Sequence, residues 1–196
     1  MSLVLASTST TRRAILDAAG IAHEAVAPGV DEEAAKAGFA ARGLDGRALA
    51  DALAELKAVK ISSRRPGDLV LGCDQTLELD DGTLLDKPGK HLAAQLKQLS
   101  GRTHRLHAAV VAAEGGHPVW RHVERVTLTV RTLSSAFIDS YVAAEGEAVA
   151  GCVGGYRIEG PGIQLFDRVE GSHFAILGLP LLPLLGWLRT RGFLAA

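Results

Sequence analysis

The chain has 196 residues, of which 47% are hydrophobic and 22% charged, a composition typical of a folded domain with a sizeable core. Its formal net charge of −1 provides no basic field for the backbone of a nucleic acid, so we expect no nucleic-acid partner. The cysteines, Cys73 and Cys152, form no metal-binding pattern and fit a reducing cytoplasm, with one disulfide as the alternative.

The termini and the apolar tracts predict a protein that is neither exported nor embedded in a membrane. No basic leader precedes the apolar run at residues 3–6, which argues against a signal peptide. The most apolar tract, residues 176–188, is short and contains two prolines, so we do not expect it to span a bilayer. We therefore expect a cytoplasmic protein without a membrane partner.

The first predicted strand, residues 3–6, runs into five consecutive hydroxyl residues and two arginines. These are residues 7–11 with Arg12 and Arg13, and a helical pattern follows over residues 14–19. Hydroxyls, arginines and the free N–H groups of a helix start together bind phosphate. The glycine-rich Walker pattern is absent, and a simple helix cap by Ser9 or Thr10 is the alternative.

Three acids follow the second predicted strand, residues 21–27. Asp31, Glu32 and Glu33 lie in a loop over residues 28–33. Acids there favour the start of a helix by complementing its dipole. They also supply the oxygen ligands that Mg²⁺ prefers, one or two carboxylates alongside substrate phosphates. Both interpretations stay open at this point.

Residues 45–62 predict the clearest helix, because Leu49, Leu53 and Leu56 form an apolar stripe. Lys57 lies at the edge of that stripe and Lys60 near its centre. Lysines in such places usually extend along apolar surface with the ammonium in water. The alternative is a cation directed into a cleft.

The stretch 69–88 predicts a strand and a hairpin that carry polar groups to the sheet. We expect a buried strand over residues 69–71 that ends at Gly72, with Asp74 at its carboxyl end, where α/β sheets bind ligands. Residues 80–82, Asp-Asp-Gly, predict a hairpin turn whose return strand delivers Lys87. Charges that are merely solvated on a surface hairpin are the alternative.

The remaining chain predicts a mixture of helices and strands, and hence an α/β protein. We expect helices over 91–99, 134–144 and 179–191, and strands over 103–113, 119–131 and 163–169. The histidines of this half show no metal-ligand spacing. Residues 151–162 are dense in glycine around Tyr156, Arg157 and Glu159. Glycine there allows close approach to a ligand, or simply makes turns.

Along nearly its whole length the chain resembles the Maf family of nucleotide pyrophosphatases. The matching runs are LASTSTTRRAIL (5–16), APGVDE (27–32), LGCDQTLELDDG (71–82), KP (87–88), LSGRTH (99–104), YVAAEGEA (141–148), GGYRIEGPGIQLFDRVEG (154–171) and LGLPLLPLL (177–185). The resemblance implies a two-lobed α/β fold with a mixed central sheet flanked by helices and a cleft, formed by a single domain over residues 1–196. It also implies a homodimer.

The implied activity is Mg²⁺-dependent hydrolysis of a nucleoside triphosphate to a monophosphate and pyrophosphate. By resemblance, Asp74 is the proton acceptor that activates water, and Glu32 and Asp74 are candidate metal ligands. The residues that the resemblance assigns to binding phosphate are Ser7, Ser9, Arg12, Arg13, Lys57 and Lys87. The alternative function is a regulator of cell division or septum formation that binds nucleotide without essential catalysis.

Three residues are expected to select the base: Thr11, Gln75 and Glu159. Gln75 and Glu159 look like the subgroup that acts on 7-methyl-GTP, whose cationic base favours a carboxylate. Thr11 departs from that subgroup, which often has Trp there. Cys152 replaces the Lys of the subgroup that acts on dTTP and UTP. The expected substrates are therefore modified or non-standard nucleotides, with 7-methyl-GTP as one candidate.

Overall fold

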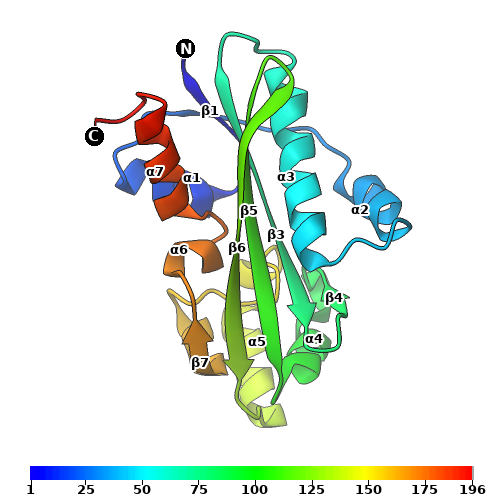
Figure 1. Cartoon of the computed structure of the whole chain (residues 1–196). Helices are drawn as coiled ribbons and strands as arrows, with labels where there is room; N and C mark the ends of the chain where they lie inside the picture. Colours follow the sequence, from blue (N-terminus) through cyan, green and yellow to red (C-terminus); the bar gives the residue numbers. More distant parts are fainter. Residues whose placement is uncertain (196) are drawn as a thin grey trace. The chain divides into compact units, whose positions relative to one another are not determined.

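The computed structural model describes residues 1–195 (Figure 1). Its α-helices are α1 (Thr10–Ala18), α2 (Glu32–Ala40), α3 (Gly46–Ser62), α4 (Leu92–Leu99), α5 (Ser135–Val149), α6 (His173–Ile176) and α7 (Leu181–Thr190). Two 3₁₀ turns, η1 (Gly89–His91) and η2 (Pro161–Leu165), precede α4 and the last strand. The strands are β1 (Leu3–Ala6), β2 (Glu24–Val26), β3 (Leu69–Leu79), β4 (Leu84–Leu85), β5 (Thr103–Glu114), β6 (His117–Val130) and β7 (Phe166–Glu170).

The strands form one mixed sheet in the order β2-β1-β3-β5-β6-β7, with β4 paired to β3. β1 runs parallel to both β2 and β3, and its last residue, Ala6, pairs with Gly72. β4 is antiparallel to β3, and β7 is antiparallel to β6. The predicted fold class, an α/β fold with a mixed sheet flanked by helices, is confirmed.

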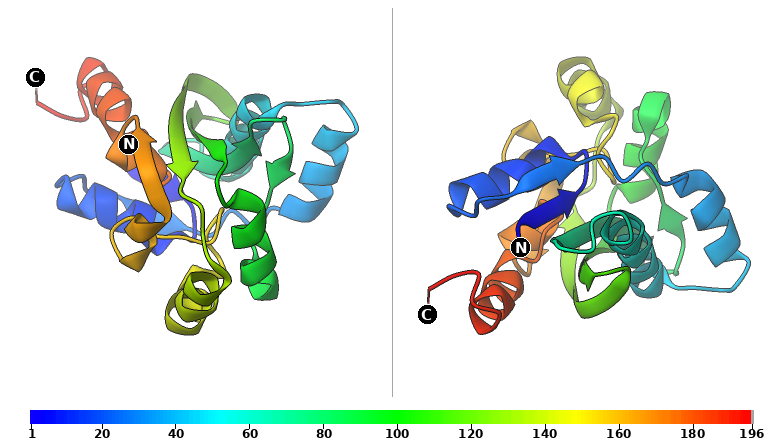
Figure 2. Two further views of the ribbon diagram at one scale, coloured as in Figure 1. Left: turned by 90° about the horizontal axis from the view of Figure 1, so that it is seen from below. Right: turned by 90° about the horizontal axis from the view of Figure 1, so that it is seen from above.

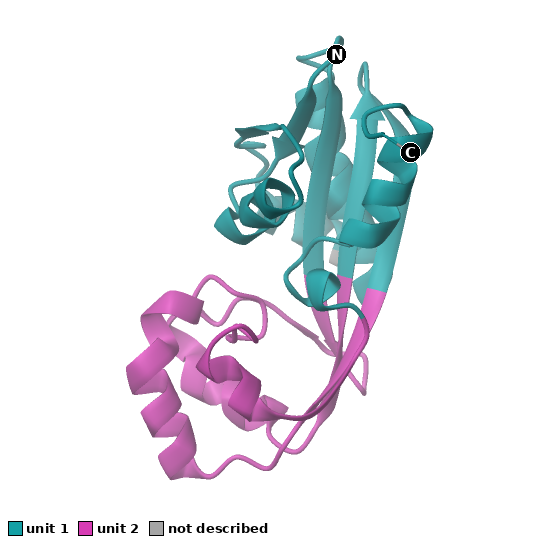
Figure 3. Ribbon diagram, turned by 90° about the vertical axis from the view of Figure 1, so that its left-hand side faces the viewer, with its two compact units in different colours: residues 1–75, 108–124, 172–196 teal, residues 76–107, 125–171 magenta. Residues whose placement is uncertain are grey.

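The chain divides into two compact units, coloured teal and magenta in Figure 3. Unit 1 comprises residues 1–75, 108–124 and 172–196, and unit 2 comprises residues 76–107 and 125–171. Strands β3, β5 and β6 each contribute residues to both units. The assignment of residues 1–196 to a single domain stays a prediction.

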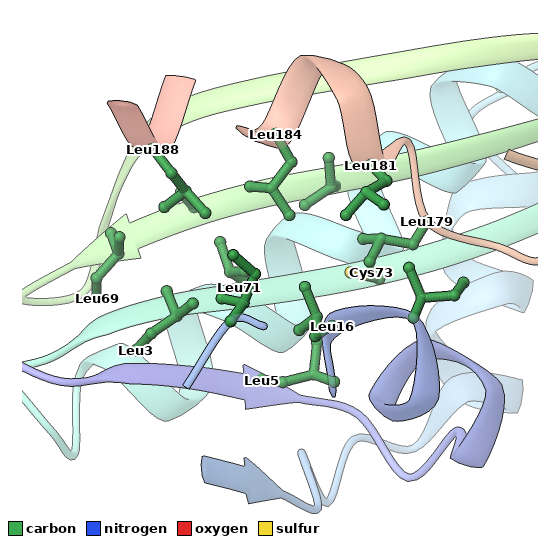
Figure 4. Close-up of a cluster of buried hydrophobic side chains, with 14 residues drawn as sticks. Leu3, Leu5, Leu16, Leu69, Leu71, Cys73, Leu179, Leu181, Leu184 and Leu188 are labelled. Atoms are coloured by element: carbon green, nitrogen blue, oxygen red, sulfur yellow. The ribbon is translucent and has the colours of Figure 1, made fainter. Parts of the chain in front are cut away.

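Unit 1 is a three-layer arrangement in which side chains alternate between the two faces of the sheet. On one face, Leu69, Leu71 and Cys73 pack against leucines of α1 and α7 (Figure 4). On the other face, a cluster made mostly of alanines joins α3 to β5; it comprises Ala50, Ala54, Ala58, Ala109, Val111 and Ala113. Figures 1 and 2 show α3 on the opposite side of the strands from α1 and α7.

Small side chains let α3 approach the sheet closely at Gly72. A Cβ added at Gly72 would lie 2.2 Å from the carbonyl oxygen of Ala54 and 2.5 Å from the amide nitrogen of Ala58. Both atoms belong to the helix backbone, which cannot move aside as a flexible side chain can. Gly72 is therefore required for the spacing between α3 and β3.

Several predicted boundaries were wrong. β3 does not stop at Gly72 but continues to Leu79, so Asp74 lies within a strand and not at its end. The neighbouring β1 stops opposite Gly72, which leaves Asp74 two residues beyond the carboxyl end of that strand. The acids of residues 31–33 begin a helix, α2, with Asp31 as its N-cap. α5 continues through Gly146 to Val149 because Glu145 and Val149 are buried.

The other boundaries differ at the ends of elements. β2 covers Glu24–Val26 only, and β7 begins at Phe166 after a 3₁₀ turn that the sequence pattern did not predict. α6, which the sequence pattern did not predict, is capped by Ser172. The predicted hairpin at residues 80–82 is confirmed, with Leu77 paired to Leu85. No helix among the described residues is long and apolar enough to cross a membrane.

Unit 2 has a small core built around His104. This histidine is fully buried, and its Nε2 lies 2.7 Å from the hydroxyl oxygen of Tyr156. The ring of Phe166 packs edge-on to that of Tyr156. Nδ1 of His104 has no hydrogen-bond partner in the described chain. Burial lowers the pKa of His104 to about 4, so the ring is neutral at pH 7.

We expect Gly72→Ala to destabilise unit 1 by about 1–3 kcal/mol, because the new methyl group overlaps the backbone of α3. Urea denaturation at pH 7.5 measures the change. Gly67→Ala is the matched control, since a Cβ there has nothing within 4 Å. Equal stability of the two variants would contradict the close approach at Gly72.

The buried His104 predicts an acid-sensitive unit 2. The pKa of His104 is about 6.5 in the unfolded chain and about 4 in the folded protein. As the pH falls through this range, the imidazole of the unfolded chain binds a proton before that of the folded protein, which favours unfolding. Stability should decline by about 2 kcal/mol between pH 7 and pH 5 on account of this group. Denaturation curves of wild type and His104→Gln at both pH values test this. The variant should lose most of that dependence, and an unchanged dependence would assign it to other groups.

Candidate active site

The centre of the candidate site is a buried ion pair between β3 and α3. The ammonium of Lys57 donates to Oδ1 of Asp74 at 2.5 Å and lies 2.7 Å from Oε1 of Glu32. The side chains of Lys57 and Asp74 are only 5% and 9% exposed, whereas that of Glu32 is 35% exposed. One cation therefore neutralises two carboxylates, and one of these is shielded from water.

The close approach at Gly72 explains why Lys57 reaches Asp74. Lys57 lies between Ala54 and Ala58, the two residues of α3 that contact Gly72. Asp74 follows Gly72 by two residues and so faces the same side of the sheet. The backbone contact brings the base of the lysine next to the strand, and the ammonium then meets the carboxylate.

The sequence pattern misjudged the two lysines of α3. Lys57, expected at the edge of the apolar stripe, is buried, while Lys60, expected near its centre, is half-buried. Lys60 donates to the carbonyl of Gly29 in the loop before α2. The predicted apolar stripe was defined by leucines alone, but alanines form as much of the buried face of α3.

Glu32 reaches the site because α2 begins there. Asp31 caps the helix by accepting a hydrogen bond from the amide of Ala34 at 3.0 Å, and Glu32 is the first helical residue. The two interpretations of the acidic loop are thus compatible. Asp31 serves the helix start, and Glu32 contacts Lys57.

The hydroxyl-rich loop lies beside Asp74. Since Ala6 pairs with Gly72, the chain enters the loop at Ser7 next to Cys73. Oγ of Ser7 accepts hydrogen bonds from the amide of Ser9 at 3.2 Å and from Nη1 of Arg12 at 3.4 Å. Nη1 of Arg12 also donates to the carbonyl oxygen of Cys73 at 3.3 Å. The guanidinium is therefore fixed one residue from Asp74.

Ser9 is the N-cap of α1, and its Oγ accepts a hydrogen bond from the amide of Arg12 at 3.3 Å. Capping is thus present, and the start of α1 also faces the site. Burial raises the pKa of the Cys73 thiol to about 11, and the charges of Arg12, Lys57 and Asp74 act on it.

The remaining predicted residues of unit 1 have different surroundings. Arg13 is exposed on α1, and Thr11 is half-buried beside it. Gln75 donates from Nε2 to the carbonyl oxygens of Ala175 and Ile176, at 2.9 and 3.0 Å. Its amide group therefore holds α6, a contact that the sequence did not suggest. A role of Gln75 in base selection stays a prediction.

Lys87 and Glu159 belong to unit 2, and both side chains are exposed. Burial raises the pKa of Cys152, and Arg157, Glu159 and Lys87 act on it electrostatically. The segments around residues 87 and 157 also approach each other directly, since a Cβ added at Gly155 would lie 3.2 Å from Cγ of Pro88. Arg157 was noted only as part of the glycine-rich segment, and its ion pair with Glu145 was not foreseen.

The described residues contain no group of three or more His, Cys, Asp or Glu side chains that could hold a metal ion. Asp74 and Glu32 nevertheless meet at a single cation, the Lys57 ammonium. Two carboxylates suffice for Mg²⁺, which completes its shell with waters and substrate phosphates. The donor set therefore fits a metal that arrives with the substrate.

Removing the ammonium should destabilise unit 1. Lys57→Met leaves Asp74 buried without its partner, at a cost of about 3–5 kcal/mol in the free energy of unfolding. The double variant Lys57→Met/Asp74→Asn should recover much of that loss, because no buried charge remains. Lys60→Met is the control from the same helix and should cost less than about 1 kcal/mol. Urea denaturation measures these proteins together with the single variant Asp74→Asn, and additive losses in the double variant would refute the coupling.

The sequence is similar to that of known proteins over nearly its whole length. The family model described as Maf-like protein matches residues 2–191. A protein named nucleoside triphosphate pyrophosphatase from Caulobacter vibrioides is 54% identical over 98% of this chain and 96% of its own length. One of the same name from Sphingopyxis alaskensis is 52% identical over 98% of each chain. A 7-methyl-GTP pyrophosphatase from Brucella abortus is 45% identical over 97% of this chain and 96% of its own. The chain belongs to the Maf family.

Proposed function

We propose that this protein hydrolyses nucleoside triphosphates to nucleoside monophosphates and pyrophosphate. The observation that carries the proposal is the buried Asp74–Lys57 pair beside the hydroxyl loop at the start of α1. The names of relatives that are 45–54% identical over nearly the whole chain support the same activity. The enzyme class expected from the resemblance agrees with those names.

In this proposal Asp74 accepts the proton of the attacking water. Attack at the α-phosphorus breaks its bond to the bridging oxygen, and pyrophosphate leaves with the electron pair. A positioned carboxylate contributes about 10²–10⁴-fold to such a step. The neighbouring ammonium of Lys57 keeps the carboxylate in place before it accepts the proton.

The loop of residues 7–11 and Arg12 would bind the phosphates. The first turn of α1 offers amide donors and the positive end of the helix dipole. Arg12 is held by Gly178 and Cys73 through Nε and Nη1, so its position is fixed before substrate arrives. Pre-positioned donors stabilise the charge that builds up on phosphate oxygens in the transition state. Arg13 and Lys87 are assigned to phosphate binding by resemblance alone.

We further propose that Mg²⁺ is the cofactor, held by Asp74 and Glu32 together with the substrate. When bound, the ion supplies charge neutralisation and orients the phosphate chain. Glu32 is suited to this because its carboxylate is partly exposed, and it contacts the same lysine as Asp74.

The substrate proposed is a modified or non-standard nucleotide, with 7-methyl-GTP as one candidate. Support comes from the Brucella relative of that name and from the carboxylate of Glu159, which would favour a cationic base. A homodimer stays a prediction from resemblance. The cytoplasmic location and the absence of nucleic-acid and membrane partners stay predictions from composition.

Substitution of the base tests the activity. Asp74→Asn should lower kcat by about 10²–10⁴-fold while nucleotide binding persists, because the amide cannot accept the proton. Pyrophosphate release and calorimetric titration with a non-hydrolysable triphosphate measure the two properties. Asp139→Asn, an exposed position on α5, is the control and should leave kcat unchanged. Full turnover by Asp74→Asn would contradict the role of Asp74 as the base, whereas nucleotide binding without turnover by the wild type would favour the alternative, a nucleotide-binding regulator.

A panel of triphosphates tests cofactor and substrate together. With Mg²⁺ the protein should release pyrophosphate from at least one of 7-methyl-GTP, GTP, dTTP, UTP and modified pyrimidine nucleotides. Chelation of the metal with EDTA should abolish turnover, and added Mg²⁺ should restore it. Turnover that survives chelation would contradict the metal proposal, and no turnover of any nucleotide would contradict the enzyme proposal.

A further inference from the structure

One face of α5 holds the glycine-rich segment of unit 2. Tyr141 and Glu145 are four residues apart and therefore lie on the same face of the helix. The hydroxyl of Tyr141 donates to the carbonyl of Gly155 at 3.2 Å. Oε2 of Glu145 accepts a hydrogen bond from Nη2 of Arg157 at 2.7 Å. The helix thus fixes the segment at two points that are two residues apart.

Arg157 is also the base of a tight loop. The amide of Gly160 donates to the carbonyl of Arg157 at 3.3 Å. A Cβ added at Gly162 would lie 2.5 Å from that same carbonyl oxygen, so the loop folds directly back on its first residue. Glu159 lies within this loop and is exposed. The position of Arg157 therefore determines where the Glu159 carboxylate is presented.

The ion pair that anchors the loop is largely shielded on the helix side. The side chain of Glu145 is 11% exposed and that of Arg157 is 39% exposed. Nε of Arg157 is buried without a hydrogen-bond partner in the described chain. Glu145 is the main cause of the raised pKa of Arg157, and Glu159 adds to it. Arg157 is thus tied to the buried carboxylate of Glu145 by an ion pair of 2.7 Å.

We propose that the Glu145–Arg157 ion pair is a positioning element for base selection, because it fixes the loop that carries Glu159. This inference rests on the proposed function, in which Glu159 faces the base of the nucleotide. Arg157 acts through Glu159 and Glu145 acts through Arg157. Neither is a catalytic residue, since the base of a triphosphate is remote from the bond that breaks.

The first test compares discrimination between nucleotides. Arg157→Gln and Glu145→Gln should each lower the ratio of kcat/KM for the preferred guanine nucleotide over UTP by about tenfold, the effect of weakening one hydrogen bond to a charged group. The loss should appear in KM, with kcat within about twofold of wild type. Arg157→Lys keeps the charge and should restore part of the ratio. Arg168→Gln removes an exposed arginine of β7 in the same unit and is the control.

The second test separates positioning from direct contact. In a Glu159→Gln background, Arg157→Gln should cause no further loss of discrimination, because its effect is transmitted through the missing carboxylate. An additive loss would show that Arg157 contacts the base itself and would overturn the proposal. A loss of thermal stability with unchanged discrimination in every variant would reduce the pair to a structural role and would also overturn it.

A measurement without turnover distinguishes a failure of this inference from a failure of the proposed function. Hydrogen exchange of the amides of Ile158, Glu159, Gly160 and Gly162 should be faster in Arg157→Gln and Glu145→Gln than in wild type or Arg168→Gln. If wild type hydrolyses no triphosphate, the proposed function fails, whereas the exchange result still reports on the anchored loop. Unchanged exchange in both variants would show that the ion pair does not hold the loop.

Discussion

The candidate site depends on the contact between the backbone of α3 and Gly72. No side chain larger than hydrogen fits at this point, because Ala54 and Ala58 present backbone atoms and not flexible side chains to the strand. The contact determines how far Lys57 stands from Asp74, and thereby makes a buried ion pair possible. A buried carboxylate without such a partner would cost several kcal/mol. Two residues of one strand therefore serve the site together: Gly72 allows the close approach of α3, and Asp74 provides the carboxylate that Lys57 meets.

The groups around Asp74 divide into those that are fixed and those that are accessible. Lys57 and Arg12 are held by hydrogen bonds to the protein itself, which orients them before substrate arrives. Glu32 is partly exposed, and the first turn of α1 carries amide donors without an acidic residue. An arrangement of fixed cations beside an accessible carboxylate suits a polyanionic substrate that brings its own metal. The Maf assignment agrees with this chemistry.

The sequence predicted the elements with strong local signals and failed where tertiary contacts decide. The hairpin after β3 and the cap by Ser9 follow from short-range chemistry. The length of β3 could not be predicted in this way, because Gly72 was interpreted as the end of the strand, whereas it is the point where α3 packs against the strand. The burial of Lys57 could not be seen from a leucine stripe. The attachment of Gln75 to α6 joins positions 100 residues apart and has no local signature. The residue pattern pointed to Asp74 as a carboxylate at the end of a strand, and the resemblance assigned it the role of proton acceptor.

The central claim is that water attacks the α-phosphorus in a step assisted by Asp74, and isotopic labelling tests it most directly. Hydrolysis of a triphosphate in H₂¹⁸O should place the label in the nucleoside monophosphate and leave the pyrophosphate unlabelled. Asp74→Asn should reduce the rate of labelling without moving its position, since the remaining groups still orient the phosphates. Label in the pyrophosphate, or release of orthophosphate with a nucleoside diphosphate, would contradict the account.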